Sequence, residues 1–370
     1  MKVVTVIGTR PEIIKLSRVI PLLDQHTNHI LVHTGQNFDY ELNEVFFKEL
    51  EIRRPDHFME SAADTPVGTI AKILLKSEEI LRKEQPDAFL VYGDTNSCLS
   101  AMVAKRLKIP IFHMEAGNRC MDQRVPEEIN RKMIDHLSDI NMPLSEHARQ
   151  YLIREGLPPE RIIKTGSCMK EIFNHYKDKI ESSNILSRLN LGAQNYMVAS
   201  IHREENVDDA YNFENLMKAL YALAETTGKK VLVSTHPRTL KKAKDLEKFA
   251  DNSQVEFLKP FGFFDYIQLQ KNAFCVLSDS GTITEESSLL GFPAVTLRNA
   301  HERPEGMDVG TLIMSGTEVD DLLKAVDVAT KLGPAPLIPD YDVDQVSNQV
   351  LKIILSYTHY VNRYVWRKKI

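Results

Sequence analysis

Three acidic sites in the first half of the chain have residues that could transfer protons. Asp94 and Glu115 each follow an apolar run, in YGDTNS and HMEAGNR, and Glu127 and Glu128 open a helical pattern in VPEEINRK. Acids in a first helical turn often only complement the helix dipole, and Glu127 with Arg131 has the spacing of a common surface pair. Each carboxylate alone is more often structural. Three of them at one site would supply the acid and the base of a proton transfer.

A metal site is the alternative use of these residues. His113 and Glu115 stand at i and i+2, so they could share one face of a strand. No further His or Cys follows at ligand spacing, and a core histidine is the more common reading of such a position. We therefore predict no metal site.

The segment GTRPEIIK, residues 8–15, follows the first apolar run and has Pro11 where a helix would begin. Arg10 and Lys15 would then lie near a helix N-terminus, which is a natural anion site. The dinucleotide fingerprint GxGxxG is absent here, which disfavours NAD. A plain turn with a solvated arginine is the alternative.

The second half of the chain carries cationic groups after its apolar runs. His202 and Arg203 lie in SIHREEN, His236 and Arg238 lie in STHPR, and Arg303 lies in AHERPEGMD. These are candidate ligands for phosphate groups.

The segment SDSGTITEES predicts a helix that opens at Ser280, Gly281 and Thr282. Backbone N–H groups at such a start can hold a pyrophosphate, and Glu286 one turn later could accept hydrogen bonds from ribose hydroxyls. A plain N-cap would look the same in sequence.

Short β-branched runs alternate with helical patterns, which is typical of parallel α/β sheets. The expected strands cover residues 2–8, 29–34, 88–92, 111–115, 140–143, 162–165, 196–201, 231–235, 255–258, 275–279 and 294–297. The 370 residues exceed the size of a single core. We predict two Rossmann-like doubly wound domains, residues 1–180 and 195–340, which face each other across a cleft. Residues 341–370 should form a helical segment that crosses back to the first domain.

Composition narrows the class of protein. The net charge is −5, so no basic surface field favours a nucleic-acid partner. No apolar stretch approaches the roughly 20 residues that span a bilayer, and no signal-peptide pattern opens the chain. The four cysteines have no paired spacing. These features predict a cytoplasmic globular protein with no membrane or nucleic-acid partner.

The motifs GTRPE, GDT, EAG with a following Arg, PEE with NR, HREEN, DSG followed by TEE, and ERPE resemble one family. Their order and spacing, over residues 1–308, are similar to those of the non-hydrolysing UDP-N-acetylglucosamine 2-epimerases. The resemblance implies the GT-B fold, a homodimer and an isomerase that needs no cofactor. Its substrate would be a UDP-linked N-acetylamino sugar.

The resemblance also implies roles for single residues. The catalytic group would be Asp94, Glu115, Glu128 and His202. The substrate-binding group would be Arg10, Lys15, Arg131, His236, Tyr266, Ser280, Gly281, Thr282, Glu286 and Arg303. Among these, Ser280, Gly281 and Thr282 would hold the diphosphate, Glu286 the ribose, and Tyr266 the uracil.

Three segments depart from the common pattern: GNRC at 117–120, SDINMP at 138–143 and HERPEGMD at 301–308. They resemble the subgroup that converts UDP-2-acetamido-2,6-dideoxy-L-talose to UDP-N-acetyl-L-fucosamine, a precursor of capsule or O-antigen. The implied route eliminates UDP across C1 and C2 and then adds it back. The alternatives are a UDP-N-acetylglucosamine 2-epimerase, a GT-B glycosyltransferase, a hydrolysing epimerase and a silent UDP-sugar sensor.

Overall fold

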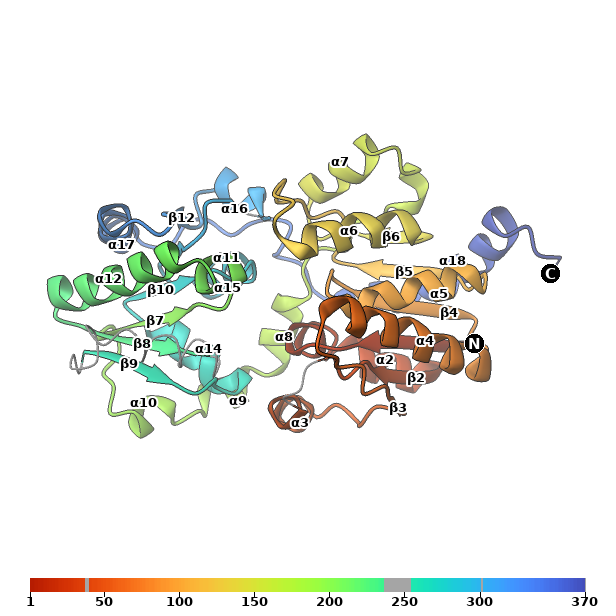
Figure 1. The fold of residues 1–370 in the computed structure, drawn as a ribbon, viewed down its shortest axis with the longest axis horizontal. Helices are drawn as coiled ribbons and strands as arrows, with labels where there is room; N and C mark the ends of the chain where they lie inside the picture. The colour runs from red at the N-terminus through yellow and green to blue at the C-terminus, as the bar shows by residue number, and fades with distance from the viewer. Residues whose placement is uncertain (37–39, 236–253, 301, 370) are drawn as a thin grey trace. The chain divides into compact units, whose positions relative to one another are not determined.

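The chain folds into two compact units (Figure 1). The computed structural model describes residues 1–36, 40–235, 254–300 and 302–369, with the backbone alone for 40–43 and 204. The first unit comprises Met1–Asn174 and Asp340–Ile370, and the second comprises His175–Pro339. The boundary expected near residue 180 falls inside α9 (Lys177–Glu181) of the second unit. His236 lies outside the described residues.

The first unit is built on a parallel six-stranded sheet in the order β3-β2-β1-β4-β5-β6. Its strands are β1 (Lys2–Ile7), β2 (Asn28–His33), β3 (His57–Phe58), β4 (Ala88–Tyr92), β5 (Ile111–Met114) and β6 (Ile140–Met142). The central strands β1, β4 and β5 are mostly apolar, and all of their residues except Lys2 are buried, as expected for a parallel sheet covered on both faces.

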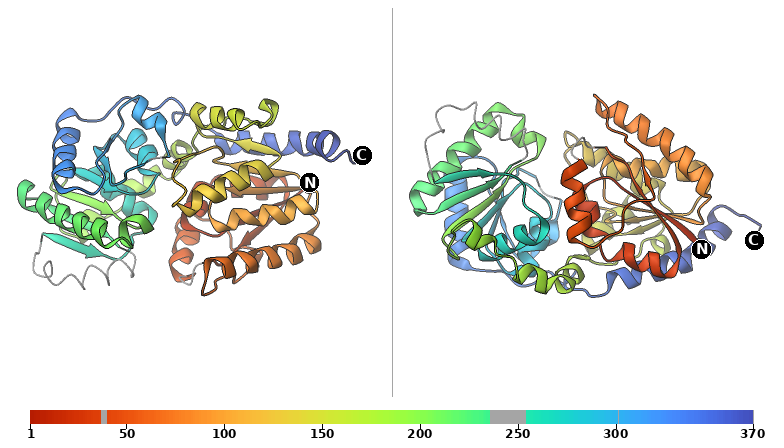
Figure 2. Two further views of the ribbon diagram at one scale, coloured as in Figure 1. Left: turned by 45° about the horizontal axis from the view of Figure 1, so that its top comes forward. Right: turned by 90° about the horizontal axis from the view of Figure 1, so that it is seen from below.

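Helices cover both faces of this sheet (Figures 1 and 2). On one face, α4 (Pro66–Glu84), α5 (Ala101–Arg106) and α6 (Pro126–Leu137) contribute Leu81, Ala104 and Ile134 to a shared apolar core. On the other face, α2 (Val19–His26) packs beside α18 (Val346–Tyr360).

The C-terminal segment belongs to the first unit because its own polar contacts hold it there. Asp340 accepts from the Ser167 amide at 3.2 Å through its carbonyl and pairs with Lys164 Nζ at 2.6 Å through Oδ1. The Ser347 amide donates to Glu171 Oε2 at 2.9 Å at the start of α18.

The second unit repeats the architecture with a parallel sheet in the order β12-β11-β10-β7-β8-β9. Its strands are β7 (Tyr196–Ser200), β8 (Lys230–Ser234), β9 (Val255–Leu258), β10 (Cys275–Ser278), β11 (Ala294–Thr296) and β12 (Ile313–Met314). One core joins the sheet to α12 (Ala210–Thr227) and α17 (Val319–Leu332), and another joins it to α14 (Phe263–Asn272) and α15 (Ile283–Leu290).

The sheets differ from the expected strands at their edges. Residues 162–165 form no strand and contribute only an isolated bridge between Ile162 and Asn141. Conversely, the two-residue strands β3 and β12 were not expected, because two residues carry no periodicity that a sequence pattern could reveal. None of the described helices is long and apolar enough to cross a membrane.

Both sheets have the doubly wound order 3-2-1-4-5-6 when their strands are counted from the start of each unit. In such sheets the topological switch point lies between the first and fourth strands, and ligands bind at the carboxyl ends there. These switch points are β1/β4 in the first unit and β7/β10 in the second.

Candidate active site

In the first unit, Asp94 and Glu115 follow the neighbouring parallel strands β4 and β5. The Tyr92 hydroxyl donates to Glu115 Oε2 at 2.5 Å. Glu115 has a φ of 62°, in the left-handed region that residues with a side chain rarely adopt. Both carboxylates are half-buried, so each keeps part of its surface open.

Arg131 on α6 joins two of the predicted carboxylates. Its Nε and Nη2 atoms lie 2.9 and 2.7 Å from Asp94 Oδ2, and its Nη1 atom donates to Glu128 Oε2 at 3.2 Å. The side chain of Asp94 is 19% exposed, whereas that of Glu128 is 0% exposed. The Arg131 guanidinium therefore links Asp94, which solvent can reach, to Glu128, which solvent cannot reach.

Glu128 is surrounded by donors from its own unit. The Cys120 amide donates to Oε2 at 3.0 Å and the Cys120 thiol at 3.3 Å, while Lys132 Nζ lies 3.4 Å from Oε1. Burial raises the pKa of Cys120, and the hydrogen bond to Glu128 and the charge of Glu128 act in the same direction. Glu128 thus fastens the segment that carries Cys120 to the first turn of α6.

His113 is a core residue, as the sequence indicates. Its Nε2 atom lies 2.8 Å from the Gly93 carbonyl oxygen, and its Nδ1 atom lies 3.0 Å from Asp135 Oδ1. Asp135 also pairs with Arg119 Nη1 at 2.7 Å. Within the described residues, no group of three or more His, Cys, Asp or Glu side chains is arranged to hold a metal ion.

The GTRPE segment forms the turn from β1 into α1 (Arg10–Lys15). Arg10 begins the helix, and its guanidinium lies over the Phe46 ring at 5.9 Å, while Lys15 ends the helix and is buried. The sequence predicts both residues near the helix start, and the structure places only Arg10 there. Lys15 lies at the other end.

Glu12 was not among the predicted site residues, yet it connects two turns of the site. Its carboxylate accepts from the Gly8 and Thr9 amides after β1 and from the Thr95 and Ser97 hydroxyls after β4. Burial raises the pKa of Glu12, although these four hydrogen bonds oppose that shift. Asp94 thus lies in a turn that Glu12 ties to the start of α1.

In the second unit, Asp279 organises the corresponding switch point. It accepts from the amides of His202 and Arg203 at 3.0 and 2.9 Å, and its Oδ1 atom lies 2.9 Å from His202 Nδ1. Burial would raise the pKa of Asp279, but the charge of His202 and these hydrogen bonds lower it to about 2. His202 remains 49% exposed. Because Asp279 fixes Nδ1, the imidazole keeps one orientation.

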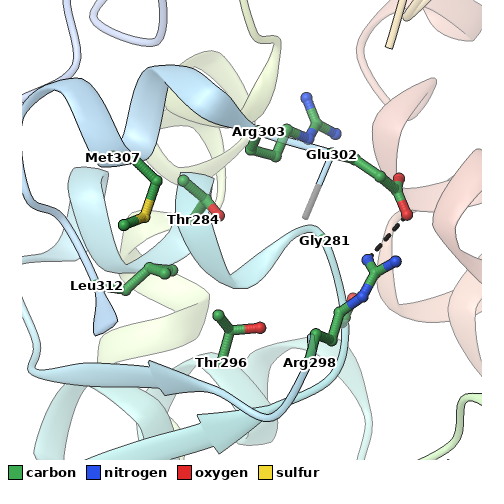
Figure 3. Close-up of a pocket in the computed structure, with 9 residues that line it drawn as sticks. Gly281, Thr284, Thr296, Arg298, Glu302, Arg303, Met307 and Leu312 are labelled. Atoms are coloured by element: carbon green, nitrogen blue, oxygen red, sulfur yellow. Dashed lines mark hydrogen bonds and ion pairs between the residues drawn. The ribbon is translucent and has the colours of Figure 1, made fainter. Parts of the chain in front are cut away.

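The helix α15 begins where the sequence predicts it, with Thr282 as N-cap. Ser280 and Gly281 line a pocket with seven further residues from the same unit, of which Arg298, Glu302 and Arg303 are charged (Figure 3). An added Cβ at Gly281 would lie 3.6 Å from Glu302 Oε2, which is an ordinary van der Waals contact.

The arginines of this pocket are held by carboxylates. Arg298 Nη1 lies 2.9 Å from Glu302 Oε1, as the dashed line in Figure 3 shows, and Arg203 Nη2 lies 3.0 Å from the same oxygen. Arg303 Nη2 lies 3.3 Å from Glu285 Oε2. A helix start with two buried arginines beside it is a suitable environment for an anion such as a diphosphate.

Glu286 and Tyr266 lie together, and neither is part of the pocket lining. Glu286 Oε2 accepts from Gln270 Nε2 at 2.6 Å. Tyr266, in the first turn of α14, hydrogen-bonds with Ser200 and Gln270, and burial, together with the Glu286 charge, raises its pKa. Its ring also packs against the apolar core of this unit.

Sequence reasoning missed several polar residues that the structure places at these sites, notably Glu12, Tyr92, Asp279 and Arg298. Glu12, Tyr92 and Asp279 fall within or next to the motifs GTRPE, GDT and DSG, and Arg298 lies a few residues before ERPE. The available signal was position, because all four lie at or within a few residues of the carboxyl end of a strand next to a switch point or its neighbour.

Two doubly wound α/β units, with acid/base candidates in one and an anion pocket in the other, define a nucleotide-sugar enzyme of the GT-B type. The family model described as UDP-N-acetylglucosamine 2-epimerase matches residues 22–355. The chain belongs to this family, whose members are isomerases.

Solved structures and a curated relative agree with this assignment. A UDP-N-acetylglucosamine 2-epimerase from Rickettsia bellii is 54% identical, with full coverage of both chains and a TM-score of 0.95. The Methanocaldococcus jannaschii enzyme in complex with UDP-GlcNAc and UDP is 32% identical over 96% of this chain and 99% of that one, with a TM-score of 0.89. The UDP-2,3-diacetamido-2,3-dideoxy-D-glucuronate 2-epimerase of Pseudomonas aeruginosa is 33% identical over 90% of this chain and 93% of its own.

Proposed function

We propose that the protein inverts C2 of a UDP-linked N-acetylamino sugar by eliminating UDP and adding it back. The observation that carries this proposal is the pair of half-buried carboxylates, Asp94 and Glu115, at the ends of adjacent strands. The C2–H bond has no neighbouring carbonyl to stabilise a carbanion. An elimination avoids that species, and its two proton transfers need groups of this kind.

The proposed reaction balances without an oxidant or a reductant. A carboxylate takes the proton from C2, the C2–H electrons form the C1=C2 double bond, and the C1–O bond breaks with its electron pair going to UDP. A proton then adds to C2 from the opposite face while the UDP oxygen bonds again to C1. No hydride is transferred, so the route uses no nicotinamide.

The second unit would bind the departing UDP. We assign the diphosphate to the backbone at Ser280, Gly281 and Thr282 and to the guanidinium groups of Arg298 and Arg303, which stabilise the charge that develops on the leaving group. His202 would present its Nε2 atom to the substrate, since Asp279 holds Nδ1. Glu286 and Tyr266 would contact the nucleoside.

The first unit would supply the groups that act on the sugar. Asp94 and Glu115 would transfer the protons, and Arg10 at the start of α1 would be a substrate-binding cation. Burial and the link through Arg131 suit Glu128 to holding Asp94 in place. This differs from the direct proton-transfer role that the resemblance implies for Glu128.

For the sugar, we propose UDP-2-acetamido-2,6-dideoxy-L-talose as substrate and UDP-N-acetyl-L-fucosamine as product. The support is the resemblance of residues 117–120, 138–143 and 301–308 to that subgroup. A cytoplasmic homodimer that supplies capsule or O-antigen precursors accompanies this proposal. The names of the Rickettsia and Methanocaldococcus relatives favour UDP-N-acetylglucosamine equally, with UDP-N-acetylmannosamine as product.

One experiment tests both parts of the proposal. The purified protein is incubated in D₂O with each nucleotide-sugar alone, and the products are followed by NMR. We expect the C2 epimer with deuterium at C2, and kcat/KM higher for the talose substrate by at least roughly 10²-fold.

Each of the other possible outcomes would contradict one part of the proposal. Retention of the original C2 hydrogen would exclude elimination, and equal or reversed preference would favour UDP-N-acetylglucosamine. Irreversible release of free UDP and sugar would indicate a hydrolysing enzyme. No isomerisation of any nucleotide-sugar would favour a glycosyltransferase or a sensor.

A further inference from the structure

Tyr92 ends β4 at the point where that strand lies beside β5. Its Cα is paired with that of Met114, the residue before Glu115. The tyrosine is 3% exposed, and its hydroxyl reaches Glu115 Oε2 at 2.5 Å. This distance falls in the range of a charge-assisted O–H···O⁻ hydrogen bond, in which a phenol donates to an ionised carboxylate.

The backbone of Glu115 shows that its placement has a cost. A φ of 62° is unfavourable for a residue with a side chain, and such strain is often found at functional positions. Gly93 lies beside the other carboxylate oxygen, where an added Cβ would meet Oε1 at an ordinary van der Waals distance of 3.9 Å. Tyr92 therefore holds one oxygen, and Gly93 lies next to the other.

We propose that Tyr92 is a positioning residue for the epimerisation, which holds the Glu115 carboxylate by Oε2 so that Oε1 faces the reacting carbon. The inference rests on the proposed function. Tyr92 itself does not touch substrate and acts through Glu115.

The hydrogen bond fixes the geometry of the Glu115 carboxylate. Without the hydroxyl, the carboxylate can rotate away from the reactive orientation, which lowers kcat more than it changes KM.

The test is Tyr92→Phe, which removes one oxygen and keeps the ring that fills the core. The matched control is Tyr196→Phe, because the buried Tyr196 hydroxyl donates to the Leu269 carbonyl oxygen at 2.7 Å in the second unit. We expect Tyr92→Phe to lower kcat by about 10- to 100-fold, with KM unchanged. The control should keep the wild-type kcat and KM.

The Glu115→Gln variant separates failure of this inference from failure of the proposed function. If Glu115→Gln loses turnover while Tyr92→Phe retains the wild-type kcat, the inference alone is wrong. A Tyr92→Phe variant that changes only KM or thermal stability would also contradict it, since that pattern indicates a structural role. If Glu115→Gln turns over normally, the role of Glu115 in the proposed function fails, and the inference fails with it.

A second variant covers the case in which Tyr92→Phe does not fold. Site-specific 3-fluorotyrosine at position 92 retains the hydroxyl and makes it a stronger donor. This variant should therefore keep kcat at or above the wild-type value, with KM unchanged. A fall in kcat would overturn the inference.

Discussion

The two units connect the turns at their switch points in the same way, but the side chains around these connections differ in charge. Both sheets share one strand order, and at each switch point one buried carboxylate ties the turn after the first strand to the turn after the fourth. In the first unit Glu12 reaches from α1 to Thr95 and Ser97. In the second unit Asp279 reaches back to the amides of His202 and Arg203.

The surroundings of the two carboxylates differ in charge. The partners of Glu12 are neutral amides and hydroxyls, so burial dominates and raises its pKa. Asp279 is equally buried, but the charge of His202 and the amide hydrogen bonds lower its pKa to about 2. The fold therefore provides the bridge between the two turns in both units, whereas the neighbouring residues set the direction in which the pKa of the bridging carboxyl shifts.

The candidate site residues around the two switch points follow the same division. The first unit presents the carboxylates Asp94 and Glu115, and the second presents His202, Arg298 and Arg303 around a helix start. In the proposed elimination, the first set would transfer protons, and the second would stabilise the departing diphosphate. Variants in the first unit should therefore affect turnover, and variants in the second should affect nucleotide affinity.

The largest effect is expected from the amide variants Asp94→Asn and Glu115→Gln. Each keeps the shape of the side chain and removes its ability to transfer a proton, so kcat should fall by about 10² to 10⁴-fold. UDP affinity, measured by calorimetry, should stay at the wild-type value. Glu78→Gln, on the exposed face of α4, is the control. Near-normal turnover in both variants would refute the assignment of these carboxylates.

The positions of these carboxylates could be predicted because the information is local. A β-branched run followed by a polar residue gives both a strand and its carboxyl end, which places Asp94 and Glu115 correctly. The start of α15 at Thr282 was predicted for the same reason, since the Ser-Gly-Thr segment is an N-terminal signal.

The features that the sequence could not predict depend on contacts between residues that are far apart in the chain. Glu12 and Ser97 are 85 residues apart, and Tyr92 and Glu115 are 23 apart, so no short-range pattern links them. The left-handed backbone at Glu115 was also unexpected, because that conformation is usual for glycine. Burial of Glu128 was not expected either, since an acid in a first helical turn is commonly exposed.

A smaller effect is expected from Arg298→Met in the second unit. Arg298 lines the pocket, and its removal leaves Glu302 paired with Arg203, so the unit should still fold. Loss of a charged donor to a phosphate should weaken UDP binding by about 10- to 100-fold, with kcat at saturating substrate less affected. Arg188→Met, at an exposed ion pair of the same unit, is the control. Wild-type UDP affinity would remove Arg298 from the proposed diphosphate site.

The smallest effect is expected in how the free energy of unfolding depends on pH. The contribution of Asp279 in the second unit should change with pH in the opposite direction to that of Glu12 in the first. A group whose pKa is lower in the folded than in the unfolded state stabilises the folded state at pH values above its unfolded-state pKa. This stability is lost as the pH falls through its folded-state pKa. For Asp279 the window runs from 3.8 down to about 2, and the loss is roughly 2 kcal/mol. Glu12 has a raised pKa, so its contribution is present below 4.5 and is lost as the pH rises above that value.

Neutral variants should remove both dependences. Relative to wild type, Asp279→Asn should be least stable near neutral pH and approach wild type as the pH falls toward 2. Relative to wild type, Glu12→Gln should lose the least stability, or gain stability, as the pH rises above 4.5, because the amide is never ionised. The two units need not unfold together. Hydrogen exchange is therefore followed separately at the amides of residues 8 and 9 and of residues 202 and 203, over a series of pH values. Parallel pH profiles for the two variants would show that the bridging carboxylates are electrostatically equivalent, against the comparison drawn from their surroundings.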